Sequence, residues 1–206
     1  MKREVPIEKE KIIRVTAALF GEKGYAVTSV REIAQALDAS IAMIYYYFKN
    51  KEEVLFSIIE ASGDNLGLAI DKAAKKNGEP LDRVRRMLFE HICSIPRRRN
   101  WVRVFVEEQG NLSKKHRGVI YKQHRKIYDL YNEQLRELKK LDLVTIDEKD
   151  FPVVVFAMLG MANWTYRWYR EGARPIDDVA RTTVDLFCHG ILNNAGRAAY
   201  AELAPL

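Results

Sequence analysis

The chain has 206 residues, 48% of them hydrophobic and 30% charged, with a formal net charge of +6. This length and apolar fraction suit one or two domains with a substantial core. No apolar run approaches the ~20 residues that a membrane span needs, and the charged N-terminus lacks the apolar segment of an export signal. Two isolated cysteines, Cys93 and Cys188, indicate neither a disulfide framework nor a zinc site. We expect a cytoplasmic protein with no metal or cofactor.

Few glycines and prolines, many strong helix formers and no alternating strand pattern predict an all-α protein of about nine helices. The expected helices, in chain order, are 8–23, 28–37, 41–47, 51–75, 81–94, 100–109, 114–141, a helix from Asp147 or Asp150 to Glu171, and 175–199. Before them, residues 1–7 are expected to be a mobile arm, which is either disordered or touches phosphate or the minor groove through Lys2 and Arg3.

The stretch from Val27 to Lys51 has the pattern of two short helices joined by a tight turn. Apolar residues recur at helical spacing in the first helix, and Ser29 with Glu32 has the spacing of a capping box. Asp38 stands where a left-handed turn residue is needed, and Ser40 can cap the second helix. This is helix-turn-helix geometry, whose second helix lies in the DNA major groove. On this pattern alone, two helices that meet at a corner without binding DNA are an equally good interpretation.

From Lys11 to Ile59 the chain resembles the N-terminal domain of the TetR-type transcriptional repressor family. The matching residues, at the family's spacing, are Ala18, Phe20, Gly24, Tyr25, Thr28, Val30, Ile33, Ala34, Tyr45, Phe48, Lys51 and Leu55. The resemblance implies a DNA-binding domain at 1–52 and a ligand-binding and dimerisation domain at 53–206. It implies a repressor that binds a palindromic operator as a homodimer and is released by a small effector.

The residues expected to contact DNA lie in or beside the two short helices. They are Thr28, Ser29, Arg31, Ser40, Ile41, Ala42, Met43, Tyr45, Tyr46, Tyr47 and Lys51. Arg31 could bond a guanine in bidentate fashion, or be a plain surface arginine. Lys51 is a candidate phosphate anchor, and Thr28 and Ser40 are candidate phosphate donors.

The second helix begins Ile41-Ala42-Met43, where the family more often has Lys-Gly-Thr. Apolar groups there could contact thymine methyls. The departure from the family pattern leaves the operator sequence open.

One recognition helix covers few base pairs, so a symmetric dimer with half-sites ~34 Å apart, or a multiple of that, is expected. The resemblance places the dimer interface on the last two helices, 151–171 and 175–199, as a four-helix bundle. The candidates for close approach and apolar area are Gly160, Trp168, Tyr169, Leu186, Phe187 and Gly190. Core packing within one subunit is the alternative for each.

The positive charge lies mostly outside the DNA-binding stretch. Residues 1–55 hold nine Lys/Arg and eight Asp/Glu, whereas residues 75–140 hold eighteen against eight. This basic region either forms an ordinary solvated surface or attracts an anionic ligand.

Asn163, Arg167 and Arg170 form a polar stripe on an otherwise apolar helix. A buried arginine needs an acceptor, which an anionic ligand or an internal glutamate can supply.

This stretch and the Glu107–Leu112 segment also resemble TetR-type regulators of lipid, sterol and aromatic-acid catabolism, some of which respond to acyl-coenzyme A thioesters. The ligand residues expected on that basis are Phe89, Arg103, Phe105, Arg125, Ile127, Tyr128, Phe156, Asn163, Trp164 and Arg167. The apolar members would hold the acyl tail, and the arginines, with Arg97 to Arg99, would meet the phosphates.

Three other functions are weighed against an acyl-CoA sensor. A sensor of lipophilic drugs that controls an efflux gene is disfavoured because the inner polar groups are basic. An enzyme is disfavoured because no phosphate loop, nucleophile elbow or metal-spaced His/Cys set is present. A helical adaptor that does not bind DNA is the third.

Overall fold

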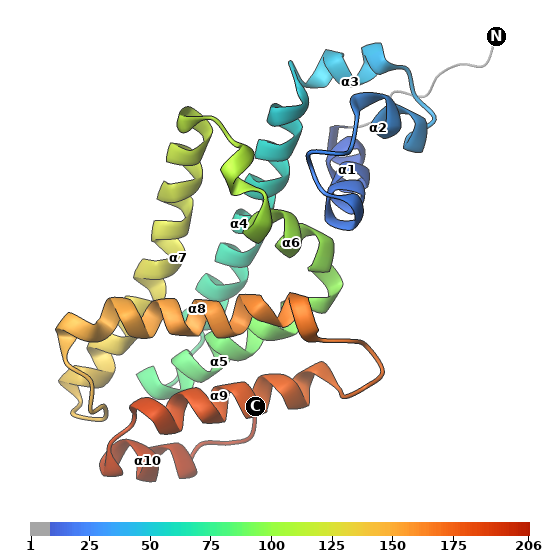
Figure 1. Cartoon of the computed structure of the whole chain (residues 1–206). Helices are drawn as coiled ribbons and strands as arrows, with labels where there is room; N and C mark the ends of the chain where they lie inside the picture. The colour runs from blue at the N-terminus through green and yellow to red at the C-terminus, as the bar shows by residue number, and fades with distance from the viewer. Residues whose placement is uncertain (1–8) are drawn as a thin grey trace. The chain divides into compact units, whose positions relative to one another are not determined.

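The computed structural model of the protein describes residues 9–206 and contains, within them, ten α-helices and no β-strand (Figure 1). The helices are α1 (Lys9–Lys23), α2 (Val30–Ala36), α3 (Ile41–Tyr47), α4 (Lys51–Ala74), α5 (Pro80–Ser94), α6 (Arg99–Glu107), α7 (Lys114–Lys140), α8 (Phe151–Trp168), α9 (Ile176–Ile191) and α10 (Asn194–Ala201). The all-α prediction is confirmed, with one helix more than expected. The N-terminal arm with Lys2 and Arg3 lies outside the described residues.

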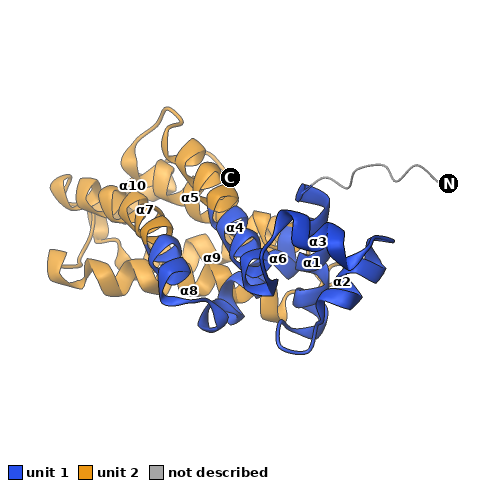
Figure 2. Ribbon diagram, turned by 90° about the horizontal axis from the view of Figure 1, so that it is seen from above, with its two compact units in different colours: residues 1–63, 98–121 blue, residues 64–97, 122–206 orange. Residues whose placement is uncertain are grey.

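The chain divides into two compact units, coloured separately in Figure 2. Unit 1 comprises residues 1–63, described from residue 9, together with 98–121; unit 2 comprises 64–97 and 122–206. Unit 1 therefore holds more than the helix-turn-helix, because α6 packs against α1 within it. The division of function at residues 52 and 53 stays a prediction.

The core of unit 1 is one apolar cluster that joins the helix-turn-helix to α1, α4, α6 and the start of α7. Its buried members include Ile12, Phe20, Ile33, Leu37, Ile44, Phe48, Leu55, Ile58, Val104, Phe105, Leu112 and Ile120. Burying a side chain of this size contributes ~1.5–3 kcal/mol relative to leaving it exposed. The two short helices of the helix-turn-helix are thus held in place by residues from the middle of the chain.

Unit 2 has its own core, in which α5 packs against both α8 and α9. Its fully buried side chains include Val84, Met87, Leu88, Tyr131, Leu135, Leu138, Val155, Met158, Ala180 and Val184. Because these residues fix the inward faces of α8 and α9, they also decide which faces of those two helices remain exposed.

The predicted last helix, 175–199, is wrong as a single element. It breaks after Ile191, and α10 starts afresh with Asn193 as its cap, whose side chain accepts a hydrogen bond from the Gly196 amide at 2.9 Å. Leu192 leaves the helical conformation and forms an isolated antiparallel bridge with Val144. A capping asparagine in an otherwise helical sequence was the signal for this break.

Candidate DNA interface and effector site

The turn between α2 and α3 is set by local side-chain chemistry. The Ser29 side chain accepts from the Glu32 amide at 3.2 Å while Glu32 accepts from the Ser29 amide at 2.8 Å, which confirms the capping box. Asp38 has φ of 51°, the left-handed conformation predicted for it. Ser40 caps α3 by accepting from the Met43 amide at 3.2 Å. Both helix starts and the turn between them are therefore fixed by these three short-range devices.

One face of α3 is buried and the opposite face is exposed. Ile44 and the following Phe48 are buried in the core of unit 1. At 100° per residue, the exposed residues Ile41, Ala42, Tyr45 and Tyr46 share a face about 140° wide. Tyr46 is 79% exposed and Ile41 is 37% exposed. These four predicted DNA residues are thus brought together on the outer side of α3.

The other members of the predicted set are placed differently. Met43 is half-buried beside the exposed face of α3, whereas Tyr47 lies on the opposite side, half-buried against the core of unit 1. Arg31 is exposed on α2. Thr28 has to be removed from the set: it is 1% exposed and its hydroxyl donates to the Gly24 carbonyl at 2.8 Å, so that group cannot reach a phosphate.

Lys51, expected to anchor a phosphate, is half-buried, and its ammonium group is turned to backbone carbonyls of the protein. Its Nζ donates to the Tyr25 carbonyl at 2.8 Å and to the Thr28 carbonyl at 2.9 Å, and it lies 4.2 Å from the centroid of the Tyr25 ring. Burial, with Glu52 and Glu108 nearby, raises the pKa of Tyr25. Lys51 therefore fixes the loop between α1 and α2 in the unbound protein.

Two side chains of the α6 region hold the end of α1. Arg103 donates to the Gly21 carbonyl at 2.7 Å and to Glu107 at 2.9 Å. Glu108 accepts from the Tyr25 amide at 3.1 Å. A cation at the C-terminal turn of a helix is favourable because the carbonyl groups there lack partners. Arg103 was predicted to bind ligand, and its contacts show instead a structural role in unit 1.

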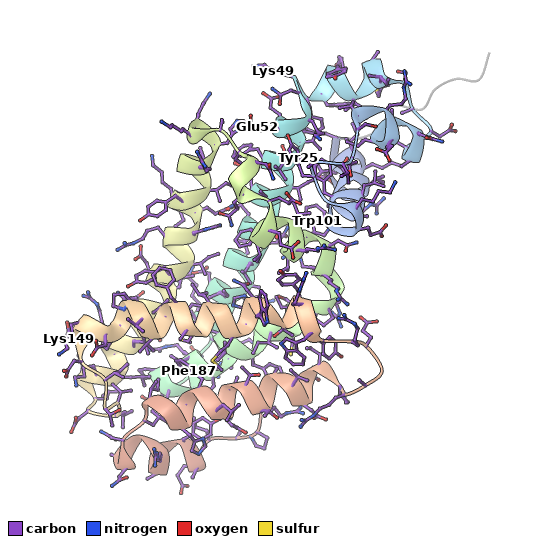
Figure 3. The ribbon with its side chains drawn as sticks, viewed as in Figure 1. Tyr25, Lys49, Glu52, Trp101, Lys149 and Phe187 are labelled. Atoms are coloured by element: carbon purple, nitrogen blue, oxygen red, sulfur yellow. The ribbon has the colours of Figure 1, made fainter. Side chains whose placement is uncertain are left out.

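A second clamp of unit 1 joins the first turn of α4 to the start of α7; Figure 3 labels Glu52 and Tyr25 in this region. Glu52 accepts from the Ser113 amide and from His116 Nδ1, both at 2.7 Å. These bonds hold the pKa of Glu52 below its usual range. The His116 ring stacks on Phe56 with the centroids 4.3 Å apart. The sequence analysis missed this cluster, since its members are far apart in the chain.

The predicted apolar ligand residues do not share one environment. Phe105 is buried in the core of unit 1, and Ile127 is buried in the core of unit 2, where Phe89 packs against it as a half-buried residue. Phe156 and Trp164, on α8, are 65% and 56% exposed. The expectation of one acyl cradle built from these five is therefore wrong, because the helices turn two of them to the surface and assign one to the core of unit 1.

The predicted polar ligand residues also separate. Arg125 bonds Asp129 at 3.0 Å and lies 5.0 Å from the Tyr128 ring centroid, an exposed arrangement along α7. Arg167 is exposed near the end of α8. Only Asn163 faces inward, where its amide oxygen lies 3.1 Å from His91 Nε2.

His91 lies at the centre of a buried polar group in unit 2. The Tyr131 hydroxyl lies 3.3 Å from both His91 Nδ1 and the Met87 carbonyl. Burial lowers the pKa of His91 to about 4, which favours the neutral ring; if Nε2 of that ring donates to the Asn163 amide oxygen, Nδ1 is left as an acceptor for the Tyr131 hydroxyl. Its partners Tyr131 and Asn163 come from α7 and α8, so the spacing of these residues in the sequence does not reveal the group.

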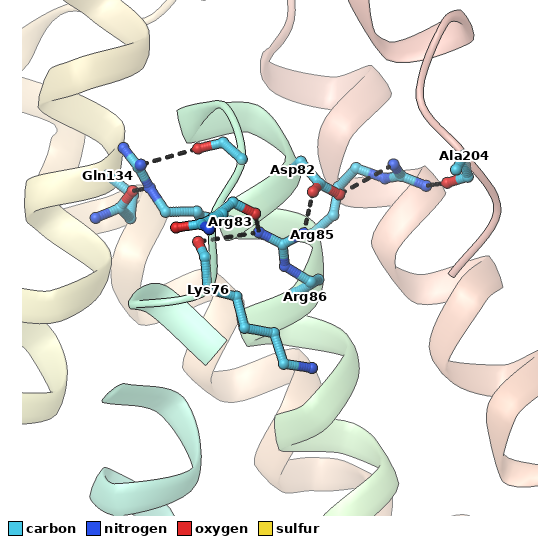
Figure 4. A network of polar contacts seen from close by, with 9 residues as sticks. Lys76, Asp82, Arg83, Arg85, Arg86, Gln134 and Ala204 are labelled. Carbon is cyan, nitrogen blue, oxygen red and sulfur yellow. Dashed lines mark hydrogen bonds and ion pairs between the residues drawn. The ribbon is translucent and has the colours of Figure 1, made fainter. Parts of the chain in front are cut away.

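Several arginines of the basic region, residues 75–140, bind other groups of unit 2 (Figure 4). Arg83 donates to Gln134 at 2.9 Å and to the Gly78 carbonyl at 3.0 Å. Arg86 pairs with Asp82, and the buried Arg85 donates to the Ala204 carbonyl at 3.2 Å. These three arginines bind protein groups, so they do not form a free anion-binding surface.

The predicted dimer residues on α8 and α9 fall into two groups. Gly160 and Trp168 on α8, and Leu186 and Gly190 on α9, are exposed. Tyr169 and Phe187 are wrong as interface residues, because both are buried in the core of unit 2. The Tyr169 hydroxyl donates to the Arg174 carbonyl at 3.0 Å.

Within residues 9–206, no group of three or more His, Cys, Asp and Glu side chains is arranged to hold a metal ion. Among the same residues, none of the helices has the length and apolarity to cross a membrane.

Two family models match the chain in separate regions. Residues 12–58 match the model described as bacterial regulatory proteins, tetR family, and residues 77–191 match the tetracyclin repressor-like C-terminal domain. The second match alone covers more than half of the chain.

Individual relatives agree with these matches. The negative transcriptional regulator IcaR of the icaADBC biofilm operon of Staphylococcus aureus is 28% identical over 159 residues, which cover 76% of this chain and 81% of that protein. The crystal structure of PfmR, a TetR family regulator from Thermus thermophilus, is 30% identical with a TM-score of 0.78 and covers 86% of this chain and 96% of its own.

A third similar structure is AibR, solved in complex with isovaleryl coenzyme A and operator DNA. It is 26% identical with a TM-score of 0.79 and covers 86% of this chain and 96% of its own. The matches join the helix-turn-helix of unit 1 to a C-terminal domain of the same kind of regulator. The chain therefore belongs to the tetR family of bacterial regulatory proteins, and it is a DNA-binding transcriptional regulator, not an enzyme.

Proposed function

We propose that the protein is a repressor that binds a palindromic operator as a homodimer and leaves it when a small effector binds. The observation that carries this proposal is the exposed outer face of α3, formed by Ile41, Ala42, Tyr45 and Tyr46 and rigidly capped by Ser40. In a helix-turn-helix this face enters the major groove, while hydroxyl and basic groups around it hold phosphates.

The test of DNA binding is a salt-dependent gel shift with the promoter beside the protein's own gene. Affinity should fall steeply with salt, since each neutralised phosphate releases counterions. The Tyr46→Ala variant should bind at least tenfold more weakly. Tyr121→Ala is the matched control, because Tyr121 is also a highly exposed tyrosine of unit 1 but lies on α7. Equal loss in both variants, or no shift at any salt, would refute the proposed interface.

Dimerisation is proposed through the exposed faces of α8 and α9. Val153, Phe156, Trp164 and Trp168 are large exposed apolar groups along α8. On α9, Leu186 is 66% exposed, with Gly190 one turn beyond it. A stable interface buries ~800 Å² on each partner, and aromatic residues are typical of its centre. Small residues on facing helices would allow a close approach.

Leu186→Glu tests the interface by placing a charge on it. We expect the variant to sediment as a monomer with unchanged helicity, because an unpaired charge in an apolar interface is costly. Leu68→Glu is the matched control, since Leu68 is 69% exposed in unit 2 on α4. A wild-type monomer, or dissociation of both variants alike, would refute this interface.

For the effector we propose an acyl-coenzyme A thioester. Support comes from the similarity to AibR, whose structure contains isovaleryl coenzyme A. An effector with a coupling energy of ~1–3 kcal/mol would weaken operator binding about 5- to 150-fold.

A panel of acyl-coenzyme A thioesters, including isovaleryl coenzyme A, should be titrated into the preformed operator complex. Free coenzyme A and isovaleric acid are the controls for the two halves of the ligand. Release by at least one thioester and by neither control is expected. Release by none of the thioesters would overturn this part of the proposal and leave the repressor assignment standing.

A further inference from the structure

The exposed face of α3 carries no group that can form a bidentate hydrogen bond to a base. From Ile41 to Tyr47 the helix contains no arginine, lysine, asparagine, glutamine, aspartate or glutamate. Reading a base pair by hydrogen bonds in the major groove relies mainly on such side chains. Resting on the proposed operator binding, we propose that Ile41 and Ala42 recognise thymine through its C5 methyl group.

Both residues lie in the first turn of α3, which is the end that contacts base edges in a helix-turn-helix complex. Both are exposed, and Ser40 fixes the start of the helix by accepting from the Met43 amide. The aliphatic groups are therefore presented outward from a rigid end of the helix. Neither of these apolar side chains belongs to the core of unit 1, to which α3 contributes the buried Ile44 and the half-buried Tyr47.

The tyrosines on the same face belong to the second turn and suit a different task. Tyr45 and Tyr46 each carry a single hydroxyl at the end of a long ring, and both are more than half exposed. A single hydroxyl can bond a phosphate oxygen and so fix the register of the helix, but it cannot distinguish the four base pairs as a bidentate group does. By elimination, the first turn of α3 is the part that contacts the bases.

In the major groove only thymine presents a methyl group, so an apolar contact is a specific signal. Removing one buried methyl-sized group from such a contact should weaken binding about fourfold. In a symmetric site the loss occurs at both half-sites, which gives about 15-fold in all. Arg31, exposed on α2, is the candidate for the separate task of bonding guanine.

The test begins by letting the wild-type protein select its operator from a random double-stranded pool. Each thymine of the selected half-site is then replaced by deoxyuridine, which removes the methyl and keeps the hydrogen-bonding edge. We expect one or two thymine positions at which the change, made in both half-sites, weakens binding about 15-fold. At every other thymine the change should weaken binding less than twofold. Binding that is insensitive to deoxyuridine at every position would refute the proposal. Failure to select any operator would instead refute the proposed function.

Ile41→Ala assigns the effect to its residue. Because alanine favours helix more than isoleucine does, we expect the variant to fold, which circular dichroism checks. It should bind the thymine and deoxyuridine operators with nearly equal affinity at the position that Ile41 reads. Ala42→Ser provides the same measurement for the second residue. If both variants keep the full discrimination of the wild type, the assignment to these residues is wrong.

An independent probe separates methyl contacts from hydrogen-bonded readout. Replacing guanine by 7-deazaguanine removes the N7 acceptor that a bidentate arginine uses. Ile41→Ala should remain sensitive to this change, whereas Arg31→Gln should lose the sensitivity and still distinguish thymine from deoxyuridine. If Arg31→Gln instead abolishes the distinction between thymine and deoxyuridine, methyl recognition by α3 is refuted.

Discussion

Replacing His91 with glutamine should change how the stability of unit 2 depends on pH. Burial lowers the pKa of His91 from 6.5 to about 4, so the folded protein resists protonation that the unfolded chain accepts. Between these two values the unfolded state binds more protons, and stability therefore falls as the pH falls from about 6.5 to about 4. At 1.36 kcal/mol per pKa unit the full loss is about 3 kcal/mol, of which about 2 kcal/mol is reached at pH 5.

The assay is urea unfolding at pH 7.5 and at pH 5.0, at one chain concentration because a dimer's apparent stability depends on it. Hydrogen exchange of α5 amides reports unit 2 separately. His91→Gln should lose about 2 kcal/mol less than the wild type between the two pH values, even if it is less stable at both. His189→Gln, at an exposed histidine of α9, is the control and should behave like the wild type. Equal pH losses in wild type and His91→Gln would refute the reasoning.

Two further substitutions test how unit 1 is held together. Lys51→Met removes the bonds to the Tyr25 and Thr28 carbonyls, so thermal unfolding should show a loss of ~1.5–3 kcal/mol. If Lys51 instead served only as a phosphate anchor, stability would be unchanged and the salt slope of operator binding would fall by about one. Gly21→Ala would place a Cβ 2.5 Å from the Asn100 Cβ, between α1 and α6, and should cost ~1–3 kcal/mol in urea unfolding. Gly118→Ala, with no atom within 4 Å of its new Cβ, is the control, and an equal effect there would contradict close packing at Gly21.

The helix-turn-helix could be predicted from sequence because its determinants are local. The capping box needs residues three apart, and the left-handed turn needs one residue that tolerates the conformation. Ser29, Asp38 and Ser40 therefore behave in the structure as their positions predict. Neither device depends on what the distant chain does.

The effector and dimer residues were harder to predict because composition does not tell which way an apolar residue faces. Leu186 and Phe187 are neighbours on α9, yet Leu186 is exposed and Phe187 is buried. The spacing of apolar residues indicates which side of a helix faces the core, but α8 is apolar over much of its circumference. Which stripe turns inward is settled by packing against α5, a partner that the sequence does not name.

The residues that hold the DNA-reading helices in place could not be predicted from the sequence. Arg103 and Glu108 bind backbone groups of Gly21 and Tyr25, more than eighty residues earlier in the chain. A backbone partner leaves no trace in the pattern of side chains, which is why Arg103 was predicted to bind ligand. Their true partners lie at the end of α1 and just beyond it. The Gly21 carbonyl is in the last turn, where carbonyls lack helical partners, and the Tyr25 amide is in the following loop. The unit that presents α3 therefore includes α6, and a change in α6 acts on the same body that carries the recognition helix.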